Sequence, residues 1–568
     1  MENRHKEAGH SQGAAGTASR AASRVFRTYE ALAAERGGPL APIARQLGWA
    51  WERLGQPMRL VVVGQIKRGK STLVNALLGE EVAATGQLEL TFTISEFCHG
   101  DDRVVFVRYK DGTSEGPLPP AALEGLTVRD PARLGQLRRI RKVEFVMPNE
   151  LLRTFRLVDT PGLGSVHLID AQNTVDYLGL GSAPRIGAQR SAARDTLDAM
   201  GRTAADVHEE SVREIVEADA VLYLFSRGLH ERDDETVAEF LGDARSSVTP
   251  LRAFGVLSLC DRYWPPDRDL PGHPDPVTYD PMDAARLIAD RYMADSRTGR
   301  LFFTVVPIAG LVGIGARLLT GEEFGWLDQL RMVEPKVLAR RLGDAQRFAT
   351  ATQLPDVPLP VAMRERLIRR LGAWGTYRAC GYLRDGEGQD KVRDRLVADS
   401  GVTQLRELIA GHFGSRASTI KLDHGLRDVA AEIGRCRAGL RRAGEEVPVL
   451  VDVIAAQVER LRISDHDSAE LSVLAACYNQ ELDLDEAEVA EIRAVTGENG
   501  PTWAARLGQP ENTPVRELRA EAERLVAKWA QREQDPTLNR ATLRAAHTIR
   551  LSYDRILHQI PPPTSGSR

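Results

Sequence analysis

The pattern of apolar positions divides the chain into two parts. Up to about residue 330, short runs of β-branched and aromatic residues alternate with amphipathic segments, as strands and helices do in turn. Beyond it, apolar residues recur at helical spacing over 327–342, 361–371, 402–413, 422–440, 449–461, 515–529 and 543–560. The first part predicts a doubly wound α/β sheet of parallel strands, and the second a mostly α-helical stalk or bundle.

Changes in composition set the predicted domain boundaries. We expect a disordered tail over 1–22, which is rich in Gly, Ala and Ser, and a helical segment over 23–56 that packs with the stalk. The α/β domain would then span 57–330, the helical bundle 331–560, and a short proline-containing tail 561–568.

The first candidate chemistry lies where the first strand, 61–63, ends. Residues 64–71 match G-x-x-x-x-G-K-[ST] and run into an apolar helical segment. In such a loop, backbone N–H groups and the helix N-terminus surround phosphate oxygens, while the lysine reaches the β- and γ-phosphates and the serine binds Mg²⁺. The sequence therefore predicts a nucleotide site, with these phosphate-binding residues: Gly64, Gln65, Lys67, Arg68, Gly69, Lys70, Ser71 and Thr72.

A second phosphate-binding signal follows the strand 155–158. Asp159 can hold Mg²⁺ through water, and the backbone N–H of Gly162 can meet the γ-phosphate. Between the two motifs, Thr91 is the threonine predicted to close over Mg²⁺ and the γ-phosphate, with Thr93 as the alternative. The metal ligands are thus predicted to be Ser71, Thr91 and Asp159. The polar segment 166–210 is interpreted as a mobile switch region.

The base is predicted to be guanine. Asp261 follows an apolar strand and could accept the N1 and N2 protons of guanine, which adenine cannot offer. The Ala309 N–H could donate to O6, and Ser258 begins the base-binding stretch. The usual [NT]-K-x-D motif has become Ser-Leu-Cys-Asp, so the lysine that packs on the base is replaced by Leu259. We therefore expect weaker guanine selectivity.

The predicted catalytic residues are Lys67, Lys70, Thr91 and Gly162. Leu163 stands where small GTPases place a water-orienting glutamine, so water must be held by other means. Lys67 could stabilise charge that develops on the leaving oxygen, as an arginine finger does; the alternative is a solvent-facing lysine.

Composition narrows the partners. The net charge is −4, which gives no general attraction to nucleic acid or to anionic lipid. Five cysteines lie far apart without a C-x-x-C pair, as in proteins of a reducing compartment. We expect a cytoplasmic protein that binds no nucleic acid. Contact with membrane lipid would be peripheral, at the inner face of the cell membrane.

These residues together resemble the bacterial dynamin-like GTPases, most closely the actinobacterial members. The resemblance rests on 64–71, on Thr85-Gly86 followed by Thr91, on 159–164, 258–261 and 305–309, and it continues more faintly into 400–405. It implies a Ras-like, dynamin-type G domain on a helical stalk, GTP and Mg²⁺ as cofactors, hydrolysis stimulated when G domains dimerise, and action on membranes. At the position of Lys67, the family has either a residue that binds a monovalent cation or a cationic side chain.

Two functions fit these features. The first is a dynamin-like GTPase that associates with itself and acts in membrane association or remodelling. The alternative is a nucleotide-gated scaffold that recruits a protein partner without remodelling membranes. A third class, RNA-associated GTPases, fits poorly with the acidic balance of the chain.

Overall fold

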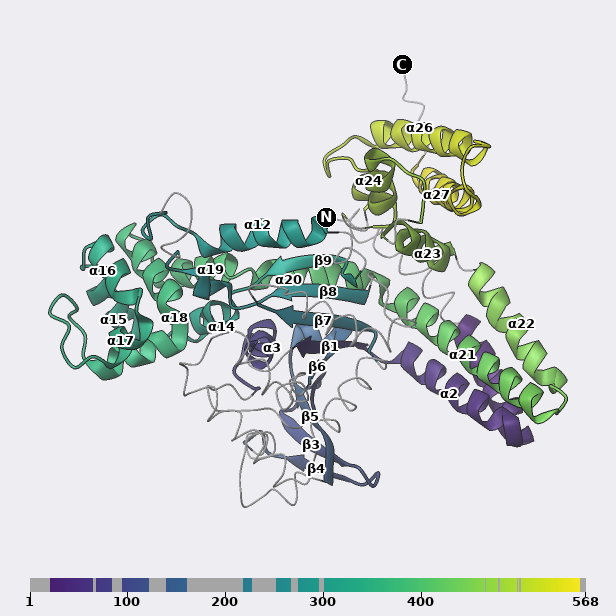
Figure 1. The fold of residues 1–568 in the computed structure, drawn as a ribbon, viewed down its shortest axis with the longest axis horizontal. Helices are drawn as coiled ribbons and strands as arrows, with labels where there is room; N and C mark the ends of the chain where they lie inside the picture. Colours follow the sequence, from purple (N-terminus) through teal and green to yellow (C-terminus); the bar gives the residue numbers. More distant parts are fainter. Residues whose placement is uncertain are drawn as a thin grey trace, which may run out of the picture.

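A mixed β-sheet forms the centre of the computed structural model (Figure 1). The structure describes residues 21–64, 68–83, 94–121, 139–160, 218–226, 252–266, 274–295, 301–464, 466–478, 481–497, 499 and 502–561. The nine strands of this described part lie in the order β4-β3-β5-β2-β6-β1-β7-β8-β9. Their bounds are β1 Met58–Gly64, β2 Ile94–His99, β3 Val104–Tyr109, β4 Ser114–Leu118, β5 Ile140–Met147, β6 Phe155–Asp159, β7 Ala220–Phe225, β8 Ala253–Leu257 and β9 Thr304–Pro307.

The predicted α/β sheet is confirmed, and it has antiparallel strands at one side in addition to the predicted parallel ones. From β6 through β1, β7 and β8 to β9 the strands are parallel, but β2 pairs antiparallel with β6, and β3 pairs antiparallel with both β4 and β5. The turn between β3 and β4 is only a few residues long and contains Gly112, whose φ is 86°. A connection this short can join only antiparallel neighbours.

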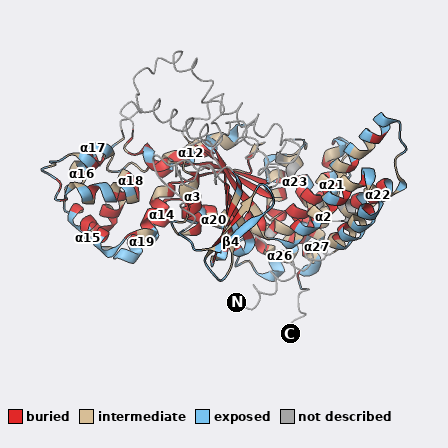
Figure 2. Ribbon diagram, turned by 90° about the horizontal axis from the view of Figure 1, so that it is seen from below, coloured by how far each residue is buried: buried red, intermediate tan, exposed pale blue. Residues whose placement is uncertain are grey.

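Alternation along β1 divides the sheet between two cores. Leu60 and Val62 pack in one core with Leu73 of α3 (Lys70–Leu78), whereas Val61 and Val63 face the other, which includes α12 (Pro281–Ala294). All four side chains of β1 are fully buried. Figure 2 shows most of the sheet as the buried centre, with exposed residues on β4 and on the outer faces of the helices. The strand that leads into the phosphate loop is therefore held from both sides.

The helices that follow α14 (Gly310–Leu318) lie in three groups (Figure 1). One continues from α14 and contains α15 Gly321–Leu330, α16 Pro335–Leu342, α17 Ala345–Thr350, α18 Val361–Arg384 and α19 Gln389–Asp399. The second pairs α2 (Ala41–Gly55) with α21 Ser415–Ala443 and α22 Val449–Ser464. The third contains α23 His466–Tyr478, α24 Glu486–Val495, α25 Trp503–Arg506, α26 Val515–Glu533 and α27 Arg540–Gln559. Between the groups, α20 (Val402–Leu408) and η5 (Ile409–Gly414) lead the chain back along the sheet.

One predicted helix differs from the structure in extent. The predicted helix 327–342 is split into α15 and α16, with Pro335 at the first turn of α16. The predicted helix 361–371 ends at a kink in α18, where Gly372 is non-helical, and a second helical stretch then continues to Arg384. A periodic apolar pattern is therefore a better guide to helix content than to the point where a helix ends.

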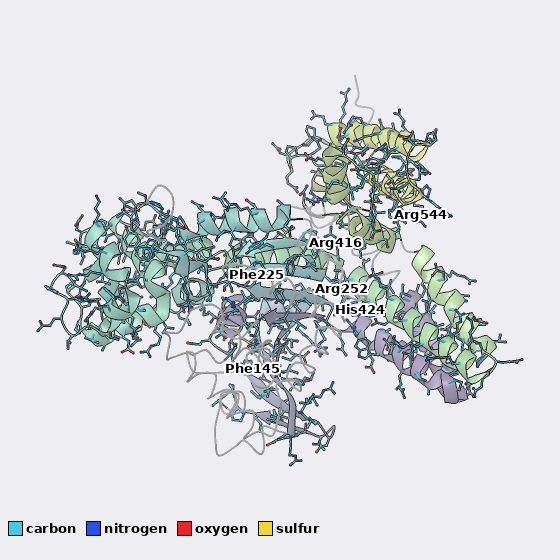
Figure 3. All side chains as sticks on the ribbon, viewed as in Figure 1. Phe145, Phe225, Arg252, Arg416, His424 and Arg544 are labelled. Carbon is cyan, nitrogen blue, oxygen red and sulfur yellow. The ribbon has the colours of Figure 1, made fainter. Side chains whose placement is uncertain are left out.

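A buried polar cluster joins α2 and α21 to the sheet. Asp219, just before β7, accepts a hydrogen bond from the Arg59 N–H (2.8 Å) and forms an ion pair with Arg53 of α2. The Nη2 atoms of Arg53 and Arg252 lie 2.9 and 3.0 Å from His424 Nδ1 on α21 (Figure 3). Burial and these guanidinium groups hold the pKa of His424 well below its ordinary value. His424 is therefore neutral and accepts hydrogen bonds through Nδ1. It lies at the end of the sheet where β1, β7 and β8 begin.

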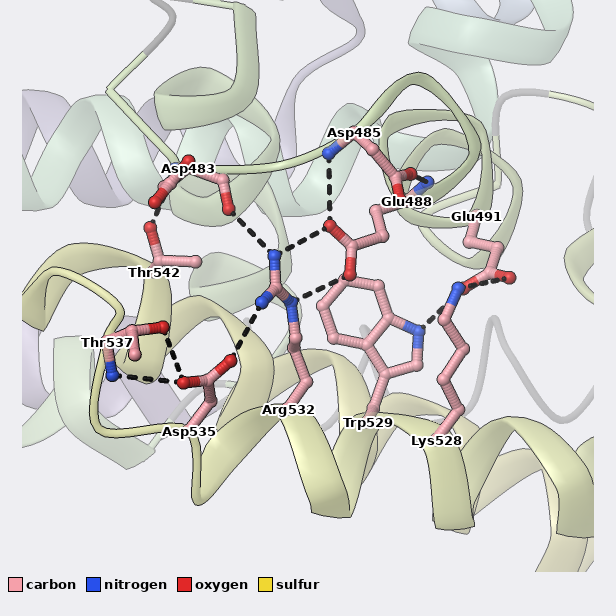
Figure 4. Close-up of polar contacts among 10 residues, drawn as sticks. All are labelled: Asp483, Asp485, Glu488, Glu491, Lys528, Trp529, Arg532, Asp535, Thr537 and Thr542. Atoms are coloured by element: carbon pink, nitrogen blue, oxygen red, sulfur yellow. Dashed lines mark hydrogen bonds and ion pairs between the residues drawn. The ribbon is translucent and has the colours of Figure 1, made fainter.

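Charged contacts join α24 to α26 in the third group (Figure 4). The fully buried Trp529 donates its indole N–H to Glu491 (2.9 Å), and Lys528 Nζ lies 2.9 Å from both carboxylate oxygens of the same residue. One turn further along α26, Arg532 pairs with Glu488 at 2.8 Å. The buried aromatic side chain and its polar partners thus fix the pairing of these two helices.

Candidate functional site

Gly64 and Gly69, at the two ends of the turn between β1 and α3, have backbone geometry typical of a phosphate loop. At Gly64 a Cβ atom would lie 2.5 Å from the backbone oxygen of Leu224, so only glycine lets β1 lie this close to β7. Gly69 has φ 84° and is the N-cap of α3, whose first residue is Lys70. Strand, glycine turn and helix N-terminus thus occur together as the motif predicts.

Lys70 lies inside the loop, with only 8% of its surface exposed. Its Nζ donates to the backbone oxygen of Gly64 over 3.1 Å. Burial lowers the pKa of Lys70 to about 8, although the nearby Asp159 carboxylate opposes the change. An ammonium group held this way is positioned for phosphate oxygens, whose negative charge would stabilise its protonated form.

Ser71 and Asp159 lie together at the same end of the sheet. The Ser71 hydroxyl donates to Asp159 Oδ2 over 2.8 Å, and Asp159 Oδ1 is buried with no hydrogen-bond partner among the described residues. Burial raises the pKa of Asp159 to about 6, while Lys70 and the Ser71 hydrogen bond act in the opposite direction. A hydroxyl and a carboxylate are the hard oxygen donors that suit Mg²⁺, so this pair fits a magnesium–phosphate group.

Thr160 anchors the strand that carries Asp159. Its hydroxyl donates to the backbone oxygen of Val62 in β1 over 2.8 Å, and the side chain is fully buried. This bond ties the carboxyl end of β6 to that of β1 and so keeps Asp159 beside α3. The predicted site residues Gln65, Lys67, Thr91, Thr93, Gly162 and Leu163, and the predicted switch region 166–210, lie outside the described residues.

The predicted base-binding turn follows β8. Ser258 hydrogen-bonds through its hydroxyl and its N–H to the backbone oxygen of Phe225 (2.9 and 2.8 Å), so it ties β8 to β7. Leu259 has φ 60°, and its Cδ2 atom lies 3.6 Å from where a Cβ on Gly69 would be. The side chain that stands in place of the usual lysine therefore contacts the phosphate loop.

Asp261 lies in the short 3₁₀ helix η4 (Cys260–Tyr263). It is 9% exposed, and its Oδ1 atom is buried with no hydrogen-bond partner in the part of the chain that the structure describes. Burial raises its pKa, and the adjacent Arg262 opposes this. A buried carboxylate without a partner is costly, and N–H groups of a base would relieve that cost.

The Ala309 N–H has a partner within the protein. It donates to the backbone oxygen of Ser400 over 2.9 Å. In this structure it is therefore not free to donate to O6 of a base, which is the role that the sequence predicted for it. Ser400 belongs to the stretch 400–405, for which the sequence predicts no specific role. Gly401 is needed there, because its φ is 76° and a Cβ atom would lie 2.4 Å from the backbone oxygen of Pro307.

The structure thus brings together Gly64, Gly69, Lys70, Ser71 and Asp159, with Leu259 beside them. Thr72 points elsewhere, toward α14, where its Cγ2 lies 3.6 Å from the position of a Cβ on Gly310. Arg68 lies at the loop and is partly exposed. This arrangement of strand, glycine turn, helix and carboxylate is typical of P-loop nucleotide-binding proteins.

Comparisons with known proteins extend this identification. A profile described as the dynamin family matches residues 60–221. Isoniazid-induced protein IniC of Mycobacterium tuberculosis (strain ATCC 25618 / H37Rv) is 27% identical over 531 residues, covering 91% of this chain and 94% of that protein. The bacterial dynamin-like protein of Nostoc punctiforme is 32% identical over 114 residues, covering 18% of this chain and 16% of that protein. Residues 60–221 thus carry a dynamin-type G domain, and the chain as a whole is similar to bacterial dynamin-like proteins.

A solved structure is also similar. Its title is "An oligomerised bacterial dynamin pair provides a mechanism for the long-range sensing and tethering of membranes", and the alignment covers 96% of this chain and 74% of that one at 12% identity. The TM-score is 0.26, a value from which nothing follows about domain arrangement. Among the described helices of the present chain, none combines the length and apolar character needed to cross a bilayer.

Proposed function

We propose that this protein binds GTP with Mg²⁺ and hydrolyses it. The observation that carries the proposal is the 2.8 Å contact between the Ser71 hydroxyl and the Asp159 carboxylate, beside the buried ammonium of Lys70. With nucleotide present, Ser71 and Asp159 would hold the metal, directly or through water, and Lys70 would meet the phosphates. The metal would neutralise charge on the phosphates.

We propose guanine as the base on the evidence of Asp261. Its unpartnered Oδ1 atom is an acceptor, which matches the N1 and N2 protons of guanine and not the bare N1 of adenine. Since the Ala309 N–H donates to Ser400, this proposal depends on the carboxylate alone.

Calorimetry with purified protein, Mg²⁺ and GTP or ATP tests both proposals. GTP should bind at least about tenfold more tightly than ATP. Lys70→Ala should abolish binding, whereas Lys336→Ala, which removes an exposed lysine on α16, should not affect it. Equal affinity for the two nucleotides would contradict the assignment of guanine, and binding of neither would contradict the nucleotide site.

Hydrolysis is proposed to depend on self-association and on Lys67, Thr91 and Gly162. The rate per molecule should rise with protein concentration if G domains stimulate one another by dimerising; a flat profile would contradict this. Lys67→Ala should lower turnover while GTP still binds. Unchanged turnover would mean that Lys67 is a solvent-facing lysine with no part in hydrolysis.

We further propose that the protein acts at membranes from the cytoplasmic side through peripheral contact. The support is its kinship with bacterial dynamin-like proteins. Co-sedimentation with liposomes of anionic lipid, with and without GTP, should show lipid binding that depends on nucleotide. No binding in any nucleotide state would favour the scaffold that recruits a protein partner.

A further inference from the structure

Helix α18 leaves helical geometry at a point beside the proposed base-reading residue. Gly372 has φ 68° and ψ −177°, a conformation that essentially only glycine adopts. A methyl group built on Gly372 would lie 3.6 Å from Asp261 Oδ2 and 3.6 Å from Leu311 Cδ2. A methyl group at position 372 would therefore be in van der Waals contact with both the carboxylate and Leu311.

The turn that carries Asp261 is fixed against the same helix. Trp264, at the end of η4, stacks on Tyr377 of α18, with ring centroids 4.9 Å apart and an angle of 24° between the planes. The Tyr377 hydroxyl in turn lies 3.4 Å from the backbone oxygen of Val277. Since these contacts set the distance between η4 and α18, the position of Gly372 beside Asp261 is built into the packing.

The Asp261 carboxylate can accept hydrogen bonds from a ligand. Asp261 is more than nine-tenths buried, and its Oδ1 atom has no partner among the described residues. Its Oδ2 atom faces the free space at Gly372. A donor pair that used both oxygens would have to enter beside the glycine.

We propose that Gly372 is a specificity-determining residue of the base site: it keeps a methyl-sized space open at Asp261 Oδ2, so that both carboxylate oxygens can accept from the purine. This inference rests on the proposed function, in which Asp261 reads guanine. A side chain at position 372 would cover Oδ2 and leave the phosphate loop unchanged. The helices α15–α19 would thus contribute to base recognition through α18.

The test compares Gly372→Ala with Gly381→Ala. Gly381 lies on the same helix, has no atom within 4 Å of a built Cβ and has no positive φ, so it controls for a glycine change in α18. Binding of GTP and of inorganic tripolyphosphate, each with Mg²⁺, is measured by calorimetry. We expect Gly372→Ala to weaken GTP binding at least about tenfold and to leave tripolyphosphate binding unchanged. Gly381→Ala should change neither.

A double variant separates lost space from backbone strain. Leu311→Ala removes the side chain on the other side of the same space, so Gly372→Ala/Leu311→Ala should recover part of the lost GTP affinity. A loss that the double variant does not reduce would come from strain and would overturn the proposal. Unchanged GTP binding, or an equal loss for GTP and tripolyphosphate, would also overturn it. If wild-type protein binds GTP no better than tripolyphosphate, the failure is that of the proposed function.

Discussion

At the scale of single residues, the phosphate-binding end of the proposed site contains buried ionisable groups, and burial disfavours the charged form of each. Burial raises the pKa of Asp159 to about 6 and lowers that of Lys70 to about 8. Without ligand, the folded state therefore favours the neutral form of each group more than the unfolded chain does. A metal ion and phosphate oxygens favour the charged forms, so ligand binding is coupled to these two titrations.

The pH dependence of Mg²⁺–GTP binding follows from the signs of these shifts. Below about pH 6, Asp159 must lose a proton when the metal binds, so affinity should rise with pH by up to about tenfold per unit. Above about pH 8, Lys70 must gain a proton, so affinity should fall. Calorimetry from pH 5 to 9 would show this maximum, and Asp159→Asn should remove the acid limb. A flat profile would contradict the roles of both groups.

Leu259 is the residue at which the base motif departs from its usual form. It is held at φ 60° against the phosphate loop, a conformation that costs a leucine about 1 kcal/mol or more. Leu259→Lys would keep an aliphatic stem on Gly69 and return a cation to the base. We expect GTP affinity to increase roughly threefold or more, with ATP affinity unchanged, as measured by competition binding. Lower GTP affinity in this variant would mean that leucine itself makes the better base contact.

The motifs predicted the glycine turn between β1 and α3, with Lys70 at the start of the helix, because these features are decided within a few residues of chain. The predicted role of Ala309 could not be judged in this way, since its N–H partner is the backbone of Ser400, far along the sequence. The role proposed for Gly372 could not be predicted from its neighbours in the sequence for the same reason. Its significance lies in Asp261, which belongs to another element.

At the scale of elements, the sequence predicted the buried strands well and their arrangement only in part. Apolar runs indicated β1, β2 and β5 to β9; most residues of these strands are buried, although β5 is buried only at alternate positions. The edge strands β3 and β4 were missed: β4 is almost wholly exposed and contains Gly116 and Pro117, so it has no apolar pattern. The grouping of the helices was not predictable either. An amphipathic helix shows which of its faces is buried, but not which other element packs against that face.

The polar cluster at the base of α2 and α21 gives a prediction at this scale. Asp219→Ala would leave Arg53 buried without its anion and the Arg59 N–H without its acceptor. Removing one member of a buried ion pair costs about 3–5 kcal/mol. The first transition in urea unfolding, followed by circular dichroism, should therefore move to clearly lower urea.

A surface ion pair is the matched control for that change. Asp328 pairs with Arg331 on α15, and 58% of its side chain is exposed. Asp328→Ala should lower stability by less than about 1 kcal/mol, because solvent screens such pairs. If the two variants unfolded at the same urea concentration, the cluster at Asp219 would not hold the α2–α21 pair to the sheet.

At the scale of the whole molecule, one continuous stretch of chain connects the turn after β9, which neighbours the base-binding turn, to helix α21. Ser400 and Gly401 pack beneath the turn after β9, and the chain then passes through α20 and the π-helical η5 into α21. The proposed nucleotide site lies at the carboxyl ends of the parallel strands, whereas His424 of α21 lies at the amino-terminal ends, where it contacts Arg252. A displacement of the base turn could therefore reach α21 along the covalent chain, without a separate contact pathway.

Glycine substitutions at the two ends of this stretch should have opposite effects. At Gly401, φ is 76° and a Cβ atom would lie 2.4 Å from the Pro307 backbone oxygen, so Gly401→Ala must displace backbone and should cost about 1–3 kcal/mol. At Gly434, exposed on α21, a Cβ atom would meet nothing within 4 Å, and Gly434→Ala should stabilise the helix by about 0.5–1 kcal/mol. Ser400 and Gly401 support the turn after β9, where the Ile308 backbone oxygen accepts from the Cys260 N–H of the base-binding turn. Only Gly401→Ala should therefore also weaken GTP binding. Urea unfolding and calorimetry on both variants check this, and normal GTP affinity in a destabilised Gly401→Ala protein would show that the stretch supports the fold without influencing the nucleotide site.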